Sequence, residues 1–290
     1  MSHKLEAKVW RPARFTLGRD DRSLEGNSFA VLILNQPLED KGLLSVVVAA
    51  DGGANRLYDL YEQGKTEKSQ SVCPSQYPIG CLRLNLSKIP NVICGDLDSI
   101  RPEVQEYYEA KGVEIIKDPD QYSTDMAKCL RYIRERSRLI LGLEETPPST
   151  PSGPQESRLD IAIFGGLGGR ADQAFSQLHH LYAEANQEPT ASVGDLYLIT
   201  KESIIFLLEK GLNKIYTPVA PGFFAENVGI IPIGKPSIIT TRGLEWDVMD
   251  WPTEFGTQIS TSNHIKADVI EIETTERVLF TLELDQQTNI

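Results

Sequence analysis

Short apolar runs rich in β-branched residues alternate with helical patterns from residue 28 to about residue 200, where this alternation stops. The first runs are AVLIL and SVVVAAD, and NVIC, VEIIKD, LDIAIFGG and DLYLIT follow. Such alternation is typical of a parallel sheet whose strands are joined by crossover helices. The pattern therefore predicts an α/β unit with a parallel, Rossmann-like sheet over residues 28–200.

Beyond residue 200 the apolar runs are short, and Gly, Pro and Asn separate them without a helical pattern. The runs include IIFLL, VGIIPI, SIITT, VIEIE and VLFTLEL. This predicts an all-β sandwich domain over residues 201–290. Residues 1–27 are then an N-terminal extension, and the polar, proline-containing stretches 65–88 and 144–157 are expected to be loop insertions.

Three expected helices carry signals for their ends. The first follows SVVVAAD, with Gly64 as its C-cap, and the second lies in RPEVQEYYEAKG, with Pro102 in its first turn and Gly112 at its end. The third lies in STDMAKCLRYIRERSR, where apolar residues recur at i, i+3, i+4 and i+7. Ser123 or Thr124 is expected to be its N-cap.

Composition limits the partners of the chain. Its net charge of -12 argues against nucleic acid and anionic membranes, because both favour a basic protein surface. No segment approaches the roughly 20 apolar residues that a membrane-spanning helix needs. The four cysteines show no metal-binding spacing, which favours a reducing compartment. We therefore expect a cytoplasmic protein without a nucleic-acid or membrane partner. Binding of small charged ligands is not excluded by this composition.

The predicted parallel strands end in polar or glycine-rich residues, namely AADGGAN, CGDLDS, KDPDQYSTD and FGGLGGRADQ. Because the carboxyl ends of such strands meet at one edge of the sheet, these segments are expected to converge on one crevice. Each also has a plain structural interpretation. DGG at 51–53 fits a tight turn, Asp96 and Asp98 fit a turn with an N-cap, and Asp125 fits a favourable charge at a helix N-terminus.

Taken together, the acidic residues predict a magnesium site. In an extended segment Asp96 and Asp98 would share a face, and a cation between them would remove their repulsion. Asp125 follows a neighbouring strand and adds a third carboxylate. Mg²⁺ is typically held by one or two carboxylates together with substrate phosphates.

The glycine-rich loop GGLGGRADQ predicts a phosphate site beside these carboxylates. Its backbone can approach a ligand closely at Gly165, Gly166, Gly168 and Gly169, and Arg170 can bind phosphate with two donors. The loop lacks the Gly-Lys-Ser/Thr of a Walker A motif and the G-x-G-x-x-G spacing of a dinucleotide site.

Six motifs occur in the order DGGAN, GDLDSI, DQYSTD, GGLGGRADQ, GLEWD and STSN. This ordered set resembles the eukaryotic thiamine pyrophosphokinases, and the two insertions resemble those of fungal members. Leu97 stands where the family often has phenylalanine. The resemblance implies transfer of a pyrophosphoryl group from ATP to the hydroxyl of thiamine, which gives thiamine diphosphate and AMP.

The resemblance also implies roles for individual residues. Asp96, Asp98 and Asp125 would hold Mg²⁺, and ATP is the co-substrate. Arg170 and Asp172 complete the catalytic set and, with Gln121, would place the triphosphate and the attacking hydroxyl. The further ligand-binding positions are Asp51, Gly52, Asn55, Gln121, Thr124, Gly166, Gly168, Trp246, Ser260, Ser262 and Asn263. Thiamine would bind at the subunit interface of a homodimer, where the β domain of one chain meets the catalytic domain of the other.

The expected thiamine contacts agree with the chemistry of that ligand. The indole of Trp246 suits a permanently charged thiazolium through cation–π attraction, and the Ser and Asn side chains of residues 260–263 can bind an aminopyrimidine edge. From the residues alone, Trp246 also fits a sandwich core and STSN fits a turn. Two other functions stay open as well: a pyrophosphokinase for another heterocyclic alcohol, of the hydroxymethylpterin type, and a non-catalytic thiamine or nucleotide sensor.

Overall fold

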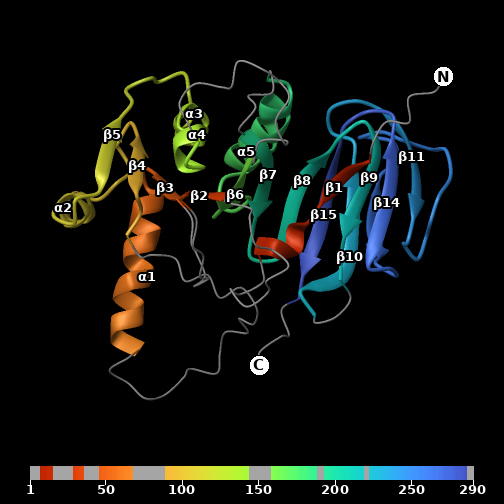
Figure 1. The fold of residues 1–290 in the computed structure, drawn as a ribbon, viewed down its shortest axis with the longest axis horizontal. Coiled ribbons are helices and arrows are strands. Elements are labelled where there is room, and N and C mark those ends of the chain that lie inside the picture. The colour runs from red at the N-terminus through yellow and green to blue at the C-terminus, as the bar shows by residue number, and fades with distance from the viewer. Residues whose placement is uncertain are drawn as a thin grey trace. The chain divides into compact units, whose positions relative to one another are not determined.

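The computed structural model describes most of the chain, which divides into two compact units (Figure 1). A β unit includes residues 1–17 and 201–290, and an α/β unit includes most of residues 18–200. The predicted insertion at 144–157 and positions 68–88 of the other insertion lie outside the described residues. The described ranges are 7–15, 29–35, 46–67, 89–143, 158–187, 193–218 and 222–285, without the side chains of 63–67.

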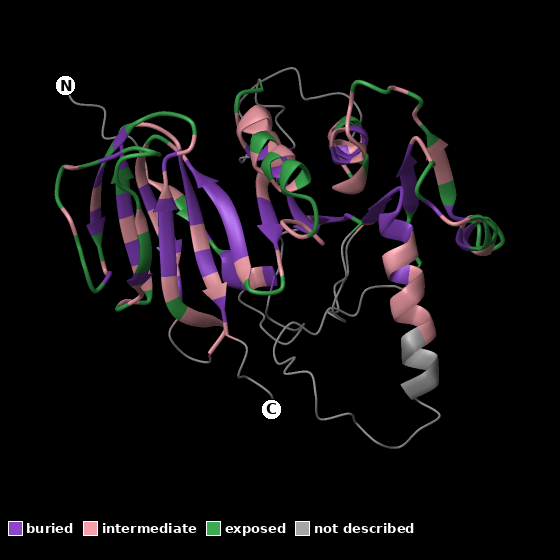
Figure 2. Cartoon of the chain, turned by 180° about the vertical axis from the view of Figure 1, so that it is seen from behind, coloured by how far each residue is buried: buried purple, intermediate pink, exposed green. Residues whose placement is uncertain are grey.

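The α/β unit is built on a parallel sheet with the strand order β7-β6-β2-β3-β4-β5. All residues of β4 and β6 are buried, as expected for strands that are covered on both faces (Figure 2). The predicted α/β organisation of this part of the chain is confirmed. The strands are β2 (Phe29–Ile33), β3 (Val46–Ala50), β4 (Val92–Gly95), β5 (Glu114–Lys117), β6 (Leu159–Phe164) and β7 (Val193–Ile199).

The helices of this unit begin largely where the sequence predicts. Pro102 is the first residue of α2, and Thr124 is the N-cap of α3, where its Oγ1 accepts a hydrogen bond from the Ala127 amide at 3.2 Å. The predicted C-cap at Gly64 is wrong, because α1 continues to Glu67 and includes the first residues of the expected insertion. The helices are α1 (Gly53–Glu67), α2 (Pro102–Glu109), α3 (Asp125–Glu135), α4 (Ser137–Ile140) and α5 (Ala171–Ala185).

Strand register brings the ends of β3, β4 and β5 together. Ala50 pairs with Cys94, and Gly95 pairs with Lys117. The residues that follow these strands therefore lie at the same edge of the sheet. Helix α3 packs on β2, β3 and β4 with its predicted apolar stripe, so its first residue also reaches this edge.

The β unit contains two sheets, with the strand orders β1-β9-β14-β11-β12 and β13-β10-β15-β8. The predicted β-rich character of the C-terminal part is confirmed, and the sandwich domain over residues 201–290 stays a prediction. The elements of the β unit are β1 (Lys8–Trp10), the 3-10 helix η1 (Pro12–Phe15), β8 (Ser203–Leu208), β9 (Gly211–Tyr216), β10 (Phe224–Ile231), β11 (Ser237–Arg242), β12 (Trp251–Thr253), β13 (Ser260–His264), β14 (Val269–Thr274) and β15 (Val278–Leu284).

The first strand comes from the segment expected to be an extension. β1 pairs in parallel with β9, and the buried Trp10 donates a hydrogen bond from Nε1 to Asn213 Oδ1 at 3.0 Å. The ring of Trp10 also lies 4.8 Å from that of Phe206 on β8, in the other sheet. Residues 8–15 therefore contribute to the core of the β unit.

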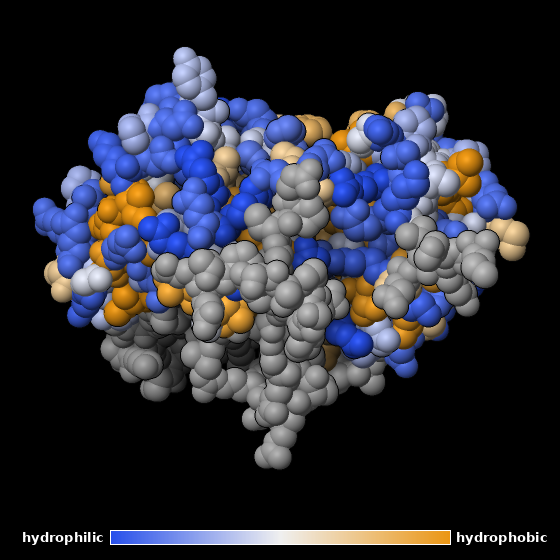
Figure 3. Space-filling view, turned by 45° about the horizontal axis from the view of Figure 1, so that its top comes forward, coloured by the Kyte–Doolittle hydropathy of each residue, from blue (hydrophilic) through white to orange (hydrophobic). Residues whose placement is uncertain are grey.

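Exposed apolar side chains form separate patches among mostly hydrophilic residues on the face shown in Figure 3. The exposed large apolar residues of the β unit include Trp246, Met249 and Phe255. None of the helices in the described ranges has the length and apolar character needed to cross a membrane.

Candidate functional site

Three carboxylates meet where β3 and β4 end. One oxygen each of Asp51, Asp96 and Asp98 lies within 4.8 Å of the other two, which is close enough for one metal ion. We call these three residues the carboxylate cluster. The sequence predicts Asp96, Asp98 and Asp125 as the metal ligands. The structure brings the first two together with Asp51, and places Asp125 next to them.

Asp51 organises the loop that follows β4. It is fully buried, and its two oxygens accept hydrogen bonds from the amides of Ser99 at 3.0 Å and Ile100 at 2.9 Å. Burial raises the pKa of its carboxyl to about 6, the two amide hydrogen bonds oppose this rise, and nearby Asp125 and Asp96 add to it. The predicted turn at Asp51 thus also carries a carboxyl group that shapes the cluster.

Asp96 and Asp98 lie in a bend of the loop that follows β4. Leu97 between them has a left-handed φ of 65°, so the expectation that the two aspartates share a face of an extended segment is wrong. The Asp98 amide donates to Asp96 Oδ1 at 3.2 Å, and Ser99 Oγ donates to Asp98 Oδ1 at 2.8 Å. A non-glycine residue in this conformation is uncommon and is often found at functional sites.

Asp125, the first residue of α3, is joined to Asp96 by a lysine that the sequence analysis missed. Asp125 Oδ1 accepts hydrogen bonds from the Asp96 amide and from Lys128 Nζ, both at 3.3 Å, and the same Nζ lies 3.3 Å from Asp96 Oδ2. The signal for Lys128 was its position, three residues after Asp125 and among the buried apolar residues of α3.

These contacts shift the ionisation of all three groups. Burial alone would raise the pKa of Asp96, but hydrogen bonds from the Asp98 amide and Lys128 lower it overall. Burial and the charge of Asp96 raise the pKa of Asp125, and Lys128 only partly offsets this. Burial opposes the charge of Lys128, yet its two carboxylate partners raise its pKa.

Gly95 allows the cluster and Asp125 to approach each other. A Cβ atom at this position would lie 2.7 Å from the Asp51 Cβ and 2.9 Å from Asp125 Oδ1. Both distances are shorter than a normal van der Waals contact, so a side chain here would push the two carboxylates apart.

The DGGAN segment connects α1 to this loop. Asn55 accepts a hydrogen bond at Oδ1 from the Arg101 amide at 3.0 Å and donates one from Nδ2 to the Ser99 carbonyl at 2.9 Å. A Cβ atom at Gly52 would lie 2.3 Å from Asn35 Nδ2, on the segment that follows β2. That Gly52 and Asn55 bind a ligand stays a prediction. The contacts show that Asn55 holds the loop after β4, which contains Asp96 and Asp98.

The glycine-rich loop lies between β6 and α5. Its Leu167 has a left-handed φ of 53°, and its amide donates to Gln177 Oε1 at 2.7 Å. A Cβ atom at Gly166 would lie 2.5 Å from Leu198 Cδ1 and 2.8 Å from the same Gln177 oxygen, so a larger residue here would displace these two side chains. Arg170 and Asp172, at the start of α5, form an exposed ion pair. The predicted phosphate-binding role of the loop, including Gly168, stays a prediction.

The DQYSTD segment links α3 to α5. Thr124 Oγ1 lies 2.9 Å from Nε2 of His180 on α5, in addition to its capping hydrogen bond. Burial lowers the pKa of His180, and His179 beside it adds to this effect. Gln121 is exposed in the preceding turn. The structure thus joins the segments after β5 and β6 through Thr124 and His180.

The β unit has a cavity that brings together three of the predicted thiamine contacts. It has a volume of about 320 Å³ and is lined by Trp246, Ser260 and Asn263, with Ile230, Ile239, Thr241, Val248, Trp251, Ile259 and Thr261. Ser262 lies outside this lining and has a left-handed φ of 56°.

Hydrogen bonds to its backbone hold Trp246 in place, and its ring is accessible. Its amide donates to Asn263 Oδ1 at 3.1 Å, and Asn263 Nδ2 donates to the Trp246 carbonyl at 2.9 Å. The residue is 55% exposed, so the alternative of a buried core tryptophan is wrong. Its ring lies 4.8 Å from that of His264. Asn263 therefore positions Trp246 at the cavity.

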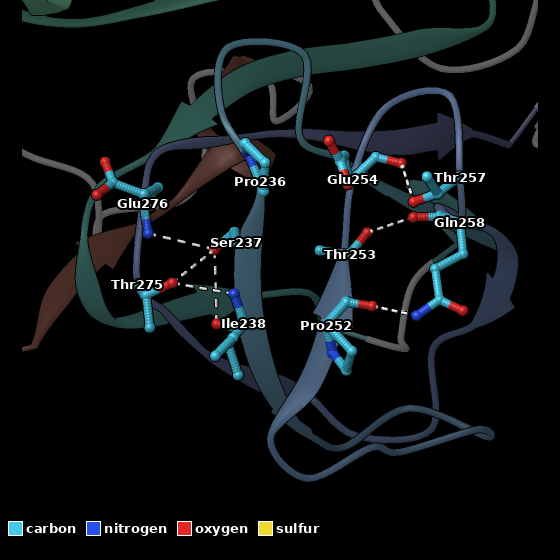
Figure 4. Close-up of a pocket in the computed structure, with 10 residues that line it drawn as sticks. All are labelled: Pro236, Ser237, Ile238, Pro252, Thr253, Glu254, Thr257, Gln258, Thr275 and Glu276. Atoms are coloured by element: carbon cyan, nitrogen blue, oxygen red, sulfur yellow. Dashed lines mark hydrogen bonds between the residues drawn. The ribbon is translucent and has the colours of Figure 1, made fainter.

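A larger cavity of about 670 Å³ is lined by residues of β11 and β12 together with Pro236, Glu254, Thr257, Gln258, Thr275 and Glu276 (Figure 4). Its hydroxyl groups bind neighbouring residues: Thr253 Oγ1 donates to the Gln258 carbonyl at 2.8 Å, and Thr257 Oγ1 donates to the Glu254 carbonyl at 3.1 Å. Ser237 Oγ lies 2.7 Å from Thr274 Oγ1. These hydroxyl groups already have partners within the chain.

Comparisons with known families agree with both units. The sequence model described as thiamin pyrophosphokinase, catalytic domain, matches residues 43–193. The model described as thiamin pyrophosphokinase, vitamin B1 binding domain, matches residues 213–279. The first match contains the carboxylate cluster, and the second contains the Trp246 cavity.

Individual proteins match over most of their length. Thiamine pyrophosphokinase 1 of Oryza sativa subsp. japonica is 33% identical over 89% of this chain and 88% of its own. Thiamine pyrophosphokinase of Saccharomyces cerevisiae is 30% identical over 90% and 86%. The crystal structure of the yeast enzyme has a TM-score of 0.75 at 27% identity and covers 100% of this chain and 95% of its own. The thiamin pyrophosphokinase structure from Candida albicans has a TM-score of 0.73 at 26% identity, over 96% and 93%.

Proposed function

This chain belongs to the thiamine pyrophosphokinase family, and we propose that it transfers a pyrophosphoryl group from ATP to the hydroxyl of thiamine, with release of AMP. The observation that carries this proposal is the cluster of Asp51, Asp96 and Asp98 at one edge of the parallel sheet, inside the part of the chain that matches the catalytic domain. The relatives support neither alternative, the pterin-type pyrophosphokinase or the sensor.

We propose that the carboxylate cluster holds Mg²⁺. The residues fit this ion, because three carboxylates offer oxygen atoms within 4.8 Å of one another and Mg²⁺ prefers oxygen ligands. When bound, the ion neutralises charge on the phosphate oxygens. Asp125 stays a predicted ligand. The cluster lies at the carboxyl ends of β3 and β4, which is where a Rossmann-like sheet binds its ligands.

The residues of the chain then align the reactants. Pyrophosphoryl transfer needs positioning and charge stabilisation more than covalent chemistry. The planar guanidinium of Arg170 can bind two phosphate oxygens at once, and its hydrogen bonds to Asp172 hold it at the start of α5. The backbone of the loop at Gly166 and Gly168 can approach the triphosphate closely, and Gln121 and Thr124 lie on the segment before α3.

We propose that thiamine binds in the Trp246 cavity of the β unit. The exposed indole offers a face to the thiazolium, and Ser260 offers a hydroxyl to the aminopyrimidine. We further propose that the active enzyme is a homodimer in which this cavity faces the catalytic unit of the partner subunit. The expected cytoplasmic location, and the expected lack of nucleic-acid and membrane partners, stay predictions.

A single assay tests the proposed function. Purified protein is incubated with ATP, Mg²⁺ and thiamine, and AMP release and conversion of the product to fluorescent thiochrome diphosphate are measured together. The proposal predicts that both signals rise in parallel and that both require thiamine. AMP release with a hydroxymethylpterin but not with thiamine, or no AMP release with either, would contradict it.

A further inference from the structure

Lys128 is a buried cation of the α/β unit that has no role in the proposed chemistry described above. Its side chain is 0% exposed, although it carries a charge. An ammonium group is costly to bury unless it is paired in good geometry. A residue of this type at this place needs a reason beyond filling the core, because methionine or leucine would do so without the cost of burying a charge.

The pairing of Lys128 connects two chain segments that are 29 residues apart. Its Nζ lies 3.3 Å from Asp96 Oδ2, in the loop after β4, and 3.3 Å from Asp125 Oδ1, at the start of α3. The Asp96 amide also donates to that Asp125 oxygen. Lys128, Asp96 and Asp125 thus form a closed set of three contacts.

This set determines how Asp96 presents its carboxylate. Lys128 binds Oδ2, and the Asp98 amide binds Oδ1, so both oxygens are held by donors from different segments. Rotation of this carboxylate would break one contact or the other. Asp96 is also the member of the carboxylate cluster that contacts both Lys128 and Asp98.

We propose that Lys128 is a positioning residue, which fixes Asp96 and Asp125 from within the core so that the carboxylate cluster is preformed for a divalent cation. This inference rests on the metal site of the proposed function. Residues that orient metal ligands without touching the metal typically change metal affinity 10- to 100-fold when they are removed. A purely structural ion pair would change stability and leave the metal affinity unaltered.

The test measures binding of Mn²⁺, as a probe for Mg²⁺, from the electron paramagnetic resonance signal of the free ion, without nucleotide or thiamine. Lys128→Met keeps the length of the side chain and removes its charge. We expect it to weaken Mn²⁺ binding by roughly 10- to 100-fold, and we expect Lys128→Arg, which keeps the charge, to recover part of this loss. Leu130→Ala is the matched control: it removes a buried side chain from the same helix, and should lower thermal stability without changing Mn²⁺ affinity.

The outcomes separate this inference from the function on which it rests. Unchanged or tighter Mn²⁺ binding by folded Lys128→Met would overturn the positioning role and leave the metal site in place. Failure of the unaltered protein to bind Mn²⁺ would overturn both. If Lys128→Met does not fold, as judged by circular dichroism, Lys128→Gln is measured in its place by the same criteria. A parallel loss of affinity in Leu130→Ala would show that the effect follows stability, and would also overturn the proposal.

Discussion

Arg170 binds both oxygens of Asp172, two residues further along the chain. Nε lies 3.1 Å from Oδ1 and Nη2 lies 2.5 Å from Oδ2, and both side chains are largely exposed. This hydrogen bonding lowers the pKa of Asp172. The pair keeps a two-pronged donor at the end of the glycine-rich loop, where the proposed triphosphate would bind.

The geometry of Arg170 should matter for turnover more than for folding. Lysine keeps the charge of this residue but loses the planar pair of donors. Arg170→Lys should therefore weaken transition-state stabilisation by about 1–3 kcal/mol, which lowers kcat/KM roughly 5- to 150-fold. The unfolding temperature should stay nearly constant, because the side chain is exposed. Arg242→Lys, in another exposed ion pair, is the control. Lower thermal stability with full activity of the folded fraction would contradict the phosphate role.

Gly95→Ala should damage the carboxylate cluster by steric contact alone. The new Cβ would meet Asp51 and Asp125 at less than 3 Å, so the carboxylates must separate. We expect Mn²⁺ affinity and turnover to fall at least tenfold, in line with the loss of ligand orientation. Gly194→Ala is the control, because its Cβ would meet another carboxylate, that of Asp160, away from the cluster. It should lower stability only. Normal Mn²⁺ binding in Gly95→Ala would show that the cluster is not the metal site.

The buried carboxyl group of Asp51 should lower the free energy of unfolding as pH rises. Its pKa is about 6 in the folded protein against an ordinary value of 3.8, because burial disfavours the charged form. The folded protein therefore binds more protons than the unfolded chain between these values. The free energy of unfolding should decrease by about 2 kcal/mol from pH 4 to pH 6 through this group, and become level above about pH 7.

Comparison with Asp51→Asn isolates this contribution. Unfolding of both proteins is followed in the absence of divalent cations at pH values from 4 to 7. The unaltered protein should lose stability relative to the variant as pH rises across this range. A constant difference between the two proteins would show that the pKa of Asp51 is not raised by burial.

Trp246→Ala should raise the KM for thiamine and leave that for ATP nearly unchanged, because the indole belongs to the β unit. Loss of a cation–π contact of about 1–2 kcal/mol corresponds to a rise in the KM for thiamine of roughly 5- to 30-fold. Trp246→Phe should recover part of the loss. Met249→Ala, an exposed apolar residue in the same loop, is the control and should leave both constants unaltered. An equal rise in both KM values would indicate general damage to the fold instead of a lost thiamine contact.

The proposed subunit arrangement predicts complementation. An Asp98→Asn chain lacks part of the metal site, and a Trp246→Ala chain lacks the thiamine platform. A heterodimer of the two would contain one composite site with both defects and one with neither. Mixing them under conditions of subunit exchange, which mass spectrometry can verify, should therefore give more activity than the sum of the separate variants. Exchange without such a gain would place the complete thiamine site within one chain.

Local sequence patterns determined the elements of this fold. The apolar stripe of Met126, Cys129, Leu130 and Ile133 is buried on α3 as predicted, and Thr124 caps that helix. These features depend on neighbours within one or two helical turns, so the sequence contains them directly. The aspartates after β4 were also found in this way, because they directly follow an apolar run.

Only the tertiary structure decided which side chains share a site. Asp51 joins Asp96 and Asp98 because β3 pairs with β4, and strand order is a long-range property that spacing along the chain does not encode. Lys128 is buried because two carboxylates from separate segments surround it, although its charge predicts a solvent-exposed position. Trp10 enters the β unit through Asn213, about 200 residues away. In each case the deciding energy comes from contacts that exist only after the chain has folded.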